Sequence, residues 1–174
     1  MDHADYLRLD ATALAARVRS GDVTPTQLLD LALAQAARVQ PQVNALVRTM
    51  EGQARAQIAQ GLAGPLAGVP FLLKDGLQDY AGVPTGLGSR SMQRFVPAQH
   101  AATTRRFLEA GLVVFGKTNL PEFGLKGVSD SAFHGPVSNP WDLARNAGGS
   151  SGGAAAAVAA GVLPMAAGSD GGGS

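Results

Sequence analysis

The chain has 174 residues, of which 45% are hydrophobic and 16% charged, and its formal net charge is +1. This length and composition predict one globular domain with a real core, and the scattered arginines give no indication of nucleic-acid binding. The absence of cysteine excludes disulfides, thiol catalysis and cysteine-based metal sites, and the three histidines have no spacing typical of a metal site.

The first sixty residues predict a layer of helices. A short helix is expected over residues 10–19, because Asp10 is a good N-cap and a glycine follows the helix. The sequence Thr24-Pro-Thr-Gln27 is typical of a helix start, with a capping threonine, a proline in the first turn and a glutamine three residues after the cap. We expect Pro41 to end that second helix. A third helix is predicted over residues 51–60.

After Gly61 the pattern changes to an alternation of strands and helices. Strands are predicted at 69–74, 112–115 and 163–167, and helices at 101–110, 121–125 and 152–160. Residues 76–97, rich in glycine, serine and proline, predict a long irregular connection. Alternating elements without repeats or an obvious linker indicate a single α/β unit with helices on both faces of its sheet.

Neither a membrane span nor a signal peptide is indicated by the sequence. No stretch approaches the roughly 18 apolar residues of a transmembrane helix. The N-terminal segment Met1-Asp-His-Ala-Asp5 is acidic and lacks the apolar centre of a signal peptide. We therefore expect a cytoplasmic protein with no membrane partner.

The segment Gly111–Thr118 fits the P-loop pattern literally. A phosphate-binding loop needs its four central residues exposed and curled around the anion. Here those residues are Leu-Val-Val-Phe, and a helix precedes them instead of following them. We therefore expect a core strand, with Lys117 at its end and without a catalytic role.

A second pattern, Gly149-Ser-Ser151-Gly-Gly153, fits the nucleophile elbow of α/β-hydrolases. That elbow requires a strand immediately before the serine. The preceding residues 139–148 have the composition of a loop, and the histidine and acid that the elbow needs would have to lie beyond Ser174. The elbow is therefore the weaker hypothesis for this segment.

A third candidate site combines Lys74, Ser150 and Ser174. Lys74 follows an apolar run at the end of a predicted strand, and burial there would lower the pKa of its ammonium group. A neutral lysine can act as a general base for a serine nucleophile. Spacing alone favours a structural role, in which Lys74 caps the strand and pairs with Asp75 or Asp79.

Five ordered blocks of sequence decide between these hypotheses. The blocks are Gly68-Val-Pro-Phe-Leu-Leu-Lys-Asp75, Gly116-Lys-Thr-Asn-Leu-Pro-Glu-Phe123, Asn139-Pro-Trp-Asp142, Gly148-Gly-Ser-Ser-Gly-Gly153 and Gly168-Ser-Asp-Gly-Gly-Gly-Ser174. In this order they resemble the amidase signature family, from about residue 61 to the last residue. The separation of the two serines, 174 − 150 = 24, is also that of the family. Ser169 is a mild departure, since many members have threonine or asparagine there.

The resemblance implies a fold, a reaction and a set of site residues. The fold would be the amidase-signature α/β fold, with a mixed central sheet covered by helices on both faces. By position, Ser174 would be the nucleophile, Ser150 the bridging serine after a cis peptide bond, and Lys74 the base. Backbone amides among Gly171, Gly172, Gly173 and Ser174 would hold the oxyanion, because residues without side chains let amides converge. The implied reaction is hydrolysis of carboxamide C–N bonds through an acyl-enzyme.

The same resemblance also sets expectations about partners and extent. A small-molecule amide would be the substrate, no metal or cofactor would be required, and a homodimer is a further expectation. Residues 1–60 would form a helical layer and residues 61–174 the triad-bearing core of the N-terminal part of one amidase domain. Family members continue well past the nucleophile, so the C-terminal remainder would be absent.

Two alternatives to a stand-alone amidase stay open. One is the glutaminase subunit of a tRNA-dependent amidotransferase, which uses the same triad; the blocks favour stand-alone amidases, including the type that opens cyclic nylon-oligomer amides. The other is an inactive fragment. A chain that truly ended at Ser174 would carry its α-carboxylate beside the oxyanion site, and that negative charge would oppose oxyanion formation.

Overall fold

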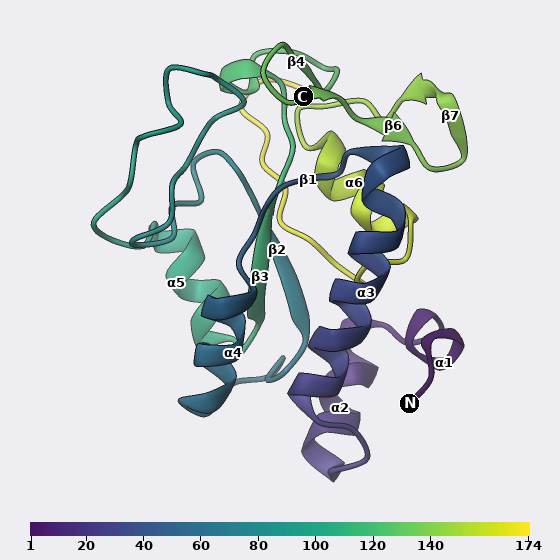
Figure 1. Cartoon of the computed structure of the whole chain (residues 1–174). Helices are drawn as coiled ribbons and strands as arrows, with labels where there is room; N and C mark the ends of the chain where they lie inside the picture. Colours follow the sequence, from purple (N-terminus) through teal and green to yellow (C-terminus); the bar gives the residue numbers. More distant parts are fainter.

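A three-stranded mixed sheet lies at the centre of the computed structural model, which describes all 174 residues (Figure 1). The strand order is β1-β3-β2, with β2 (Pro70–Lys74) parallel to β3 (Val113–Thr118) and β1 (Leu46–Thr49) antiparallel to β3. Every residue of β2 and β3 is buried. A strand that is buried on both faces reads as a continuous apolar run, which is why the sequence predicted both strands.

Helices cover both faces of this sheet. The helices are α1 (His3–Leu7), α2 (Ala11–Ser20), α3 (Pro25–Val43), α4 (Glu51–Ala59), α5 (Ala102–Glu109) and α6 (Gly152–Ala159). On one face, Leu72, Val113 and Phe115 share a core with α3, α4 and α6. On the other face, Phe71, Leu73 and Val114 pack with α2 and α5. The expected α/β architecture, a mixed sheet between helices, is therefore confirmed.

The helix starts follow the capping residues that the sequence predicts. The Asp10 carboxylate accepts a hydrogen bond from the Ala13 N–H at 2.8 Å, and Gly21 ends α2 with a left-handed φ of 81°. Thr24 and Gln27 form the complete capping box of α3. Each such cap satisfies amides that the first helical turn leaves without partners.

The end of α3 was predicted wrongly. Pro41 lies inside the helix, which continues to Val43 and ends at Asn44 in a left-handed conformation. A proline in the last turn removes only one hydrogen bond, and the Asn44 N–H still donates to Gln40 O at 2.9 Å. The Gln40 side chain then accepts from Leu46 N and donates to Leu46 O, at 2.9 and 2.7 Å. These bonds lead the chain directly from α3 into β1.

The layer of the first sixty residues is not purely helical. It contains β1, which is only four residues long and forms one edge of the central sheet, and the short helix α1, which was not predicted. The hydrophobic pattern of β1 is weak, because Leu46 is the only buried residue of this strand. Pairing with β3, and not local sequence preference, makes this segment a strand.

The predicted strand at 163–167 is also absent. That segment runs beside β2 and forms a single backbone hydrogen bond to it, from Ala167 N to Leu72 O at 2.9 Å. Pro164 lacks the N–H that a ladder would need at its position. The segment is extended without belonging to the sheet.

One short hairpin replaces the loop expected over residues 139–148, and a second hairpin precedes it in the chain. Strands β4 (Asp130–Ser131) and β5 (Gly135–Pro136) form one two-stranded sheet, and β6 (Ser138–Asn139) and β7 (Asp142–Asn146) form the other. Most of β7 is exposed, so it carries no apolar signal that a sequence pattern could reveal. The expected irregular connection at 76–97 is confirmed, and residues 121–125 contain the short 3-10 helix η1 (Glu122–Gly124).

None of the helices combines the length and the apolar character that crossing a bilayer would require.

Candidate active site

Lys74 ends β2 in the interior of the molecule, with 2% of its surface exposed. Its Nζ donates to Ser150 Oγ at 2.6 Å, to Ser169 Oγ at 3.0 Å and to Ser169 O at 3.2 Å. Its backbone N–H donates to Gln78 Oε1 at 2.7 Å. No carboxylate contacts the ammonium group. The structural alternative, in which Lys74 pairs with a neighbouring aspartate, is therefore wrong.

The two serines complete a continuous line of polar atoms. Ser150 Oγ lies 2.8 Å from Ser174 Oγ, so the order along the line is Lys74 Nζ, Ser150 Oγ and Ser174 Oγ. Ser150 precedes α6 and is buried, and Ser174 follows the extended segment that runs beside β2. The peptide bond between Gly149 and Ser150 is cis. The structure thus brings together all three side chains that the sequence singled out.

Burial lowers the pKa of Lys74 below its usual value, and the negative charge of Asp170 partly opposes this shift. Removing an ammonium group from water disfavours its charged form. A lysine that loses its proton beside a serine hydroxyl can accept the proton of that hydroxyl. The arrangement is therefore able to move protons from Ser174 through Ser150 to Lys74.

The glycine-rich loop before Ser174 is organised by Asp170. Its Oδ1 accepts hydrogen bonds from Gly172 N at 2.8 Å, Gly173 N at 2.7 Å and Ser174 N at 3.0 Å. These three bonds lower the pKa of the Asp170 carboxyl. Three of the four amides expected to face an oxyanion thus have a partner in the chain, whereas the Gly171 N–H has none.

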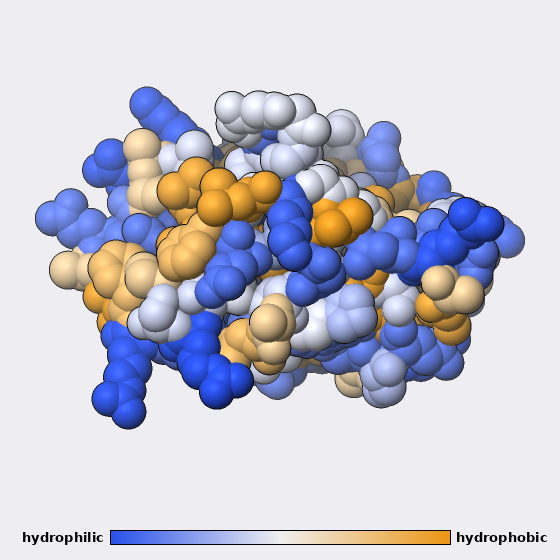
Figure 2. All heavy atoms as spheres, turned by 90° about the horizontal axis from the view of Figure 1, so that it is seen from above, coloured by the Kyte–Doolittle hydropathy of each residue, from blue (hydrophilic) through white to orange (hydrophobic).

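A pocket of about 460 Å³ opens at this end of the molecule. Its wall contains the serines and Lys74 together with glycines 171–173, and apolar residues cover the other side: Leu77, Leu87, Leu120, Phe123 and Leu125. Leu77 and Leu125 are 77% and 82% exposed. Figure 2 views this end from above, where exposed apolar side chains lie between hydrophilic ones. A concave site that combines apolar side chains with a few polar groups is typical of a small-molecule pocket.

The residues of the P-loop match and of the nucleophile-elbow match have other roles in the structure. The P-loop match lies in strand β3, as expected. Ser151 Oγ accepts from Ser169 N at 3.1 Å and donates to Ser169 O at 3.3 Å, which joins the start of α6 to the loop before Ser174. The strand β7 does precede this serine by a few residues, but Ser151 is engaged with backbone and not with a histidine.

Sequence reasoning missed the surroundings of Lys117. This lysine is fully buried, and its Nζ donates to Thr85 Oγ1 at 2.7 Å and Pro84 O at 2.8 Å and lies 3.4 Å from Asp75 Oδ1. Asp75 Oδ2 also accepts from Gly86 N at 3.0 Å. The sequence did contain a signal for this pair. The carboxyl ends of parallel strands lie side by side, and here Asp75 follows one strand while Lys117 lies near the end of the other. The Lys117–Asp75 pair therefore anchors residues 84–86 of the irregular segment to the ends of β2 and β3.

Known proteins resemble this chain in sequence. The chain matches the Amidase family over residues 27–174. A glutamyl-tRNA(Gln) amidotransferase subunit of Deinococcus deserti is 44% identical over 174 residues, which cover 97% of this chain and 35% of that protein. An acylamidase of Rhodococcus erythropolis is 42% identical over 174 residues, which cover 95% of this chain and 36% of that protein. The chain thus spans about a third of the length of the curated relatives it matches.

Solved structures give the same result. A 6-aminohexanoate cyclic dimer hydrolase superimposes with a TM-score of 0.87 at 39% identity, covering 92% of this chain and 33% of that one. The corresponding glutamyl-tRNA(Gln) amidotransferase subunit of Thermotoga maritima superimposes with a TM-score of 0.69 at 30% identity, covering 94% and 32%. Motifs, site geometry and these similarities agree, and the chain belongs to the amidase family, the amidase-signature enzymes.

Proposed function

We propose that this chain is the N-terminal, triad-bearing part of an amidase that hydrolyses carboxamide C–N bonds through an acyl-enzyme on Ser174. The observation that carries the proposal is the unbroken line from Lys74 Nζ to Ser150 Oγ to Ser174 Oγ, with separations of 2.6 and 2.8 Å. Because the chain covers about a third of its relatives, we further propose that the full-length protein continues beyond Ser174 and completes the pocket.

The first chemical step is attack of Ser174 Oγ on the amide carbonyl. Ser174 transfers its proton to Ser150, and Ser150 transfers its own proton to neutral Lys74. This requires the hydrogen bond between Lys74 and Ser150 to reverse its direction once Lys74 has lost a proton. The lowered pKa of Lys74 supports that requirement, because it enlarges the neutral fraction near neutral pH.

The second step releases the amine. Ser150 returns a proton to the leaving nitrogen, the C–N bond breaks, and the acyl group stays on Ser174 Oγ as an ester. Water then attacks the ester carbonyl while the same serine–lysine pair accepts its proton. The pair returns this proton to Ser174 Oγ as the ester C–O bond breaks, and the acid product leaves. The chemistry uses only side chains of the chain and water, so no step calls for a metal or cofactor.

The oxyanion would be held by the amides of the glycine-rich loop. Gly171 N–H is free, and the amides of Gly172, Gly173 and Ser174 donate to Asp170. We propose that Asp170 keeps this loop folded in the free protein and that the oxyanion shares or replaces its carboxylate as an acceptor. A single hydrogen-bond donor in an oxyanion hole lowers the activation free energy of acyl transfer by about 3 kcal/mol.

The choice between a stand-alone amidase and a glutaminase subunit rests on backbone geometry. Sequence identity does not separate them, at 44% to the Deinococcus amidotransferase protein and 42% to the acylamidase. The TM-scores support the stand-alone amidase, at 0.87 for the cyclic dimer hydrolase against 0.69 for the Thermotoga amidotransferase protein. We therefore favour a stand-alone amidase acting on a small amide. Ammonia release from glutamine, dependent on partner subunits, would instead identify a glutaminase.

The test is substitution of the nucleophile in the full-length protein. Ser174→Ala should reduce hydrolysis of a panel of amides, followed by ammonia and amine release, to the uncatalysed background. A fluorophosphonate probe should label Ser174 in the unsubstituted protein. Peptide mapping that places the label on Ser151, or a Ser174→Ala variant with near-normal turnover, would disprove the assignment. Cell fractionation and light scattering would test the proposed cytoplasmic location and homodimer.

A further inference from the structure

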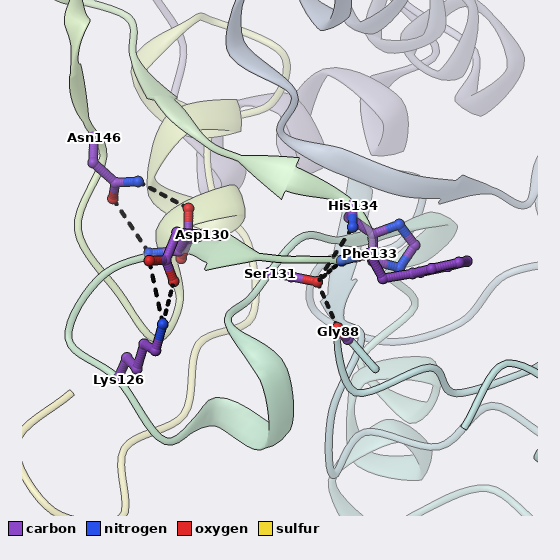
Figure 3. Close-up of polar contacts among 8 residues, drawn as sticks. Gly88, Lys126, Asp130, Ser131, Phe133, His134 and Asn146 are labelled. Carbon is purple, nitrogen blue, oxygen red and sulfur yellow. Dashed lines mark hydrogen bonds and ion pairs between the residues drawn. The ribbon is translucent and has the colours of Figure 1, made fainter. Parts of the chain in front are cut away.

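The side chain of Asn146, at the end of β7, pairs with the backbone of Ser129. Its Nδ2 donates to Ser129 O at 2.8 Å, and its Oδ1 accepts from Ser129 N at 3.2 Å. Figure 3 shows the Asn146 amide directed at the backbone beside Asp130, with both interactions dashed. The same Oδ1 accepts from Gly148 N at 2.8 Å. One amide group therefore joins two chain segments at three points.

Ser129 in turn holds the loop that carries Ser150. It is fully buried, its N–H donates to Gly148 O at 2.9 Å, and its Oγ accepts from Gly152 N at 3.2 Å. Gly148 and Gly152 lie two residues before and two residues after Ser150. The backbone on both sides of this serine is thus tied to a single residue.

Close packing leaves this loop no room to relax. A Cβ atom on Gly149 would lie 2.9 Å from the carbonyl carbon of Val128, and one on Gly152 would overlap the Ser129 side chain. Segments 127–129 and 148–152 are therefore in direct backbone contact. Any change in the position of Ser129 must move the residues around Ser150.

We propose that Ser129 and Asn146 are positioning residues that hold Ser150 Oγ between Lys74 Nζ and Ser174 Oγ. The proposal rests on the proton route given above. Neither residue lines the pocket, so each acts through the backbone and not on the substrate. Proton transfer needs both separations of the route to stay short, and a misplacement of about 1 Å can slow a reaction on the order of 100-fold.

The nearby ion pair of Lys126 and Asp130 is separate from the contacts between Ser129 and Asn146. Figure 3 shows it on the same segment, with Lys126 Nζ 3.2 Å from Asp130 Oδ1. The side chains are 59% and 41% exposed, and exposed pairs contribute little. Asp130→Asn is therefore a control for changes in this segment that leave the Ser129–Asn146 contacts intact.

The main variant is Asn146→Ala in the full-length protein, with Asn139→Ala as its matched control. Asn139 lies in the same hairpin, but its side chain only accepts from Trp141 N in an exposed turn. Asn146→Ala should lower kcat about 10- to 100-fold and leave KM within about twofold, because Asn146 affects the proton route through Ser150 and does not line the pocket. Both controls should keep kcat within about twofold. A raised KM with unchanged kcat would overturn the proposal.

A double-mutant cycle with Ser150→Ala separates positioning from general loosening of the fold. If Asn146 acts through Ser150, adding Asn146→Ala to Ser150→Ala should cause no further loss of rate. Losses that multiply would overturn the proposal. If Asn146→Ala does not fold, Asn146→Asp keeps the Oδ1 acceptor, loses the donor to Ser129 O, and enters the same cycle with a smaller expected loss.

Ser174→Ala, measured in parallel, keeps this inference apart from the proposed function. If Ser174→Ala retains the normal rate, the nucleophile and hence the function are wrong. If Ser174→Ala is inactive while Asn146→Ala equals the Asn139→Ala control, the function stands and the positioning role fails.

Discussion

Lys74 and Lys117 lie at the same end of the neighbouring parallel strands β2 and β3, are 2% and 0% exposed, and differ in their partners. Both lysines meet hydroxyl and carbonyl oxygens, but only Lys117 also meets a carboxylate, that of Asp75. Burial lowers the pKa of both, and for Lys117 the adjacent negative charge opposes that shift directly. In the proposed mechanism, the buried lysine without a carboxylate partner serves as the base, and the buried lysine with one is a structural anchor.

The two side chains are separated by the geometry of the sheet. Lys74 follows Leu72 by two residues, so it points to the same face, where α6 and Ser150 lie. Lys117 would point there too if β3 were regular, because Phe115 lies on that face. An irregularity in pairing, between Val114 and Gly116, reverses the alternation. Bulges of this kind re-aim a side chain, and here Lys117 is turned toward Thr85 and Asp75.

The largest expected effect is on activity at the Lys74 end. Lys74→Ala removes the final proton acceptor of the route, and loss of such acid–base work typically slows an enzyme about 10²- to 10⁴-fold. We expect that loss in kcat/KM of the full-length protein, with little change in its thermal midpoint. A variant that keeps half of the normal kcat/KM would make Lys74 a structural residue like Lys117.

The next effect is on stability at the Lys117 end. Lys117→Met leaves the Asp75 carboxylate buried without its partner, and breaking a buried ion pair in this way costs about 3–5 kcal/mol. Urea unfolding should report that loss in the free energy of unfolding. The expectation that Lys117 merely closes a strand therefore understates its role, although it still has no part in the proposed proton route.

A double variant tests whether the pair or the space it fills is important. Asp75→Asn combined with Lys117→Met removes both charges and keeps an acceptor for Gly86 N. Because a neutral replacement removes the orphaned charge, most of the lost stability should return. If the double variant is as unstable as Lys117→Met alone, the destabilisation comes from packing and the contrast between the two lysines is weaker.

The smallest expected effect is a shift in pH dependence. Asp170 is the negative charge that raises the pKa of Lys74, so Asp170→Asn should lower it. The limb of kcat/KM that rises with pH should then move to lower pH, by less than about one unit because Asp170 is exposed and its field is screened. The amide oxygen still accepts from the glycine-rich loop. A shift to higher pH would contradict the assigned charge interaction.

Sequence alone was sufficient to single out the three residues of the proposed proton route. Lys74, Ser150 and Ser174 stand in blocks whose composition is set by function, so resemblance located them, and β2 and β3 are apolar enough to be recognised. The capping residues Asp10 and Thr24 likewise act over three residues, a range that sequence displays directly.

The features that escaped prediction depend on contacts between distant segments. Strand β1 exists because β3 pairs with it, and the bulge that turns Lys117 away depends on two strands fitting together. The contact between Asn146 and Ser129 joins residues 17 positions apart across two hairpins that have no apolar pattern. Pro41 is a case in which a local rule failed. Proline was expected to end α3, but the helix continues to Val43 and is capped at Asn44.

The rate of fluorophosphonate labelling of Ser174 as a function of pH tests whether Lys74 activates this serine. It should be measured for the unsubstituted full-length protein, Lys74→Ala and, as a lysine control at the pocket rim, Lys126→Ala. Since neutral Lys74 activates Ser174 through Ser150, the rate should rise with pH through the lowered pKa of Lys74 and then level off. Lys74→Ala should abolish that rise, and Lys126→Ala should preserve it. A rise that survives in Lys74→Ala would contradict the proposed route.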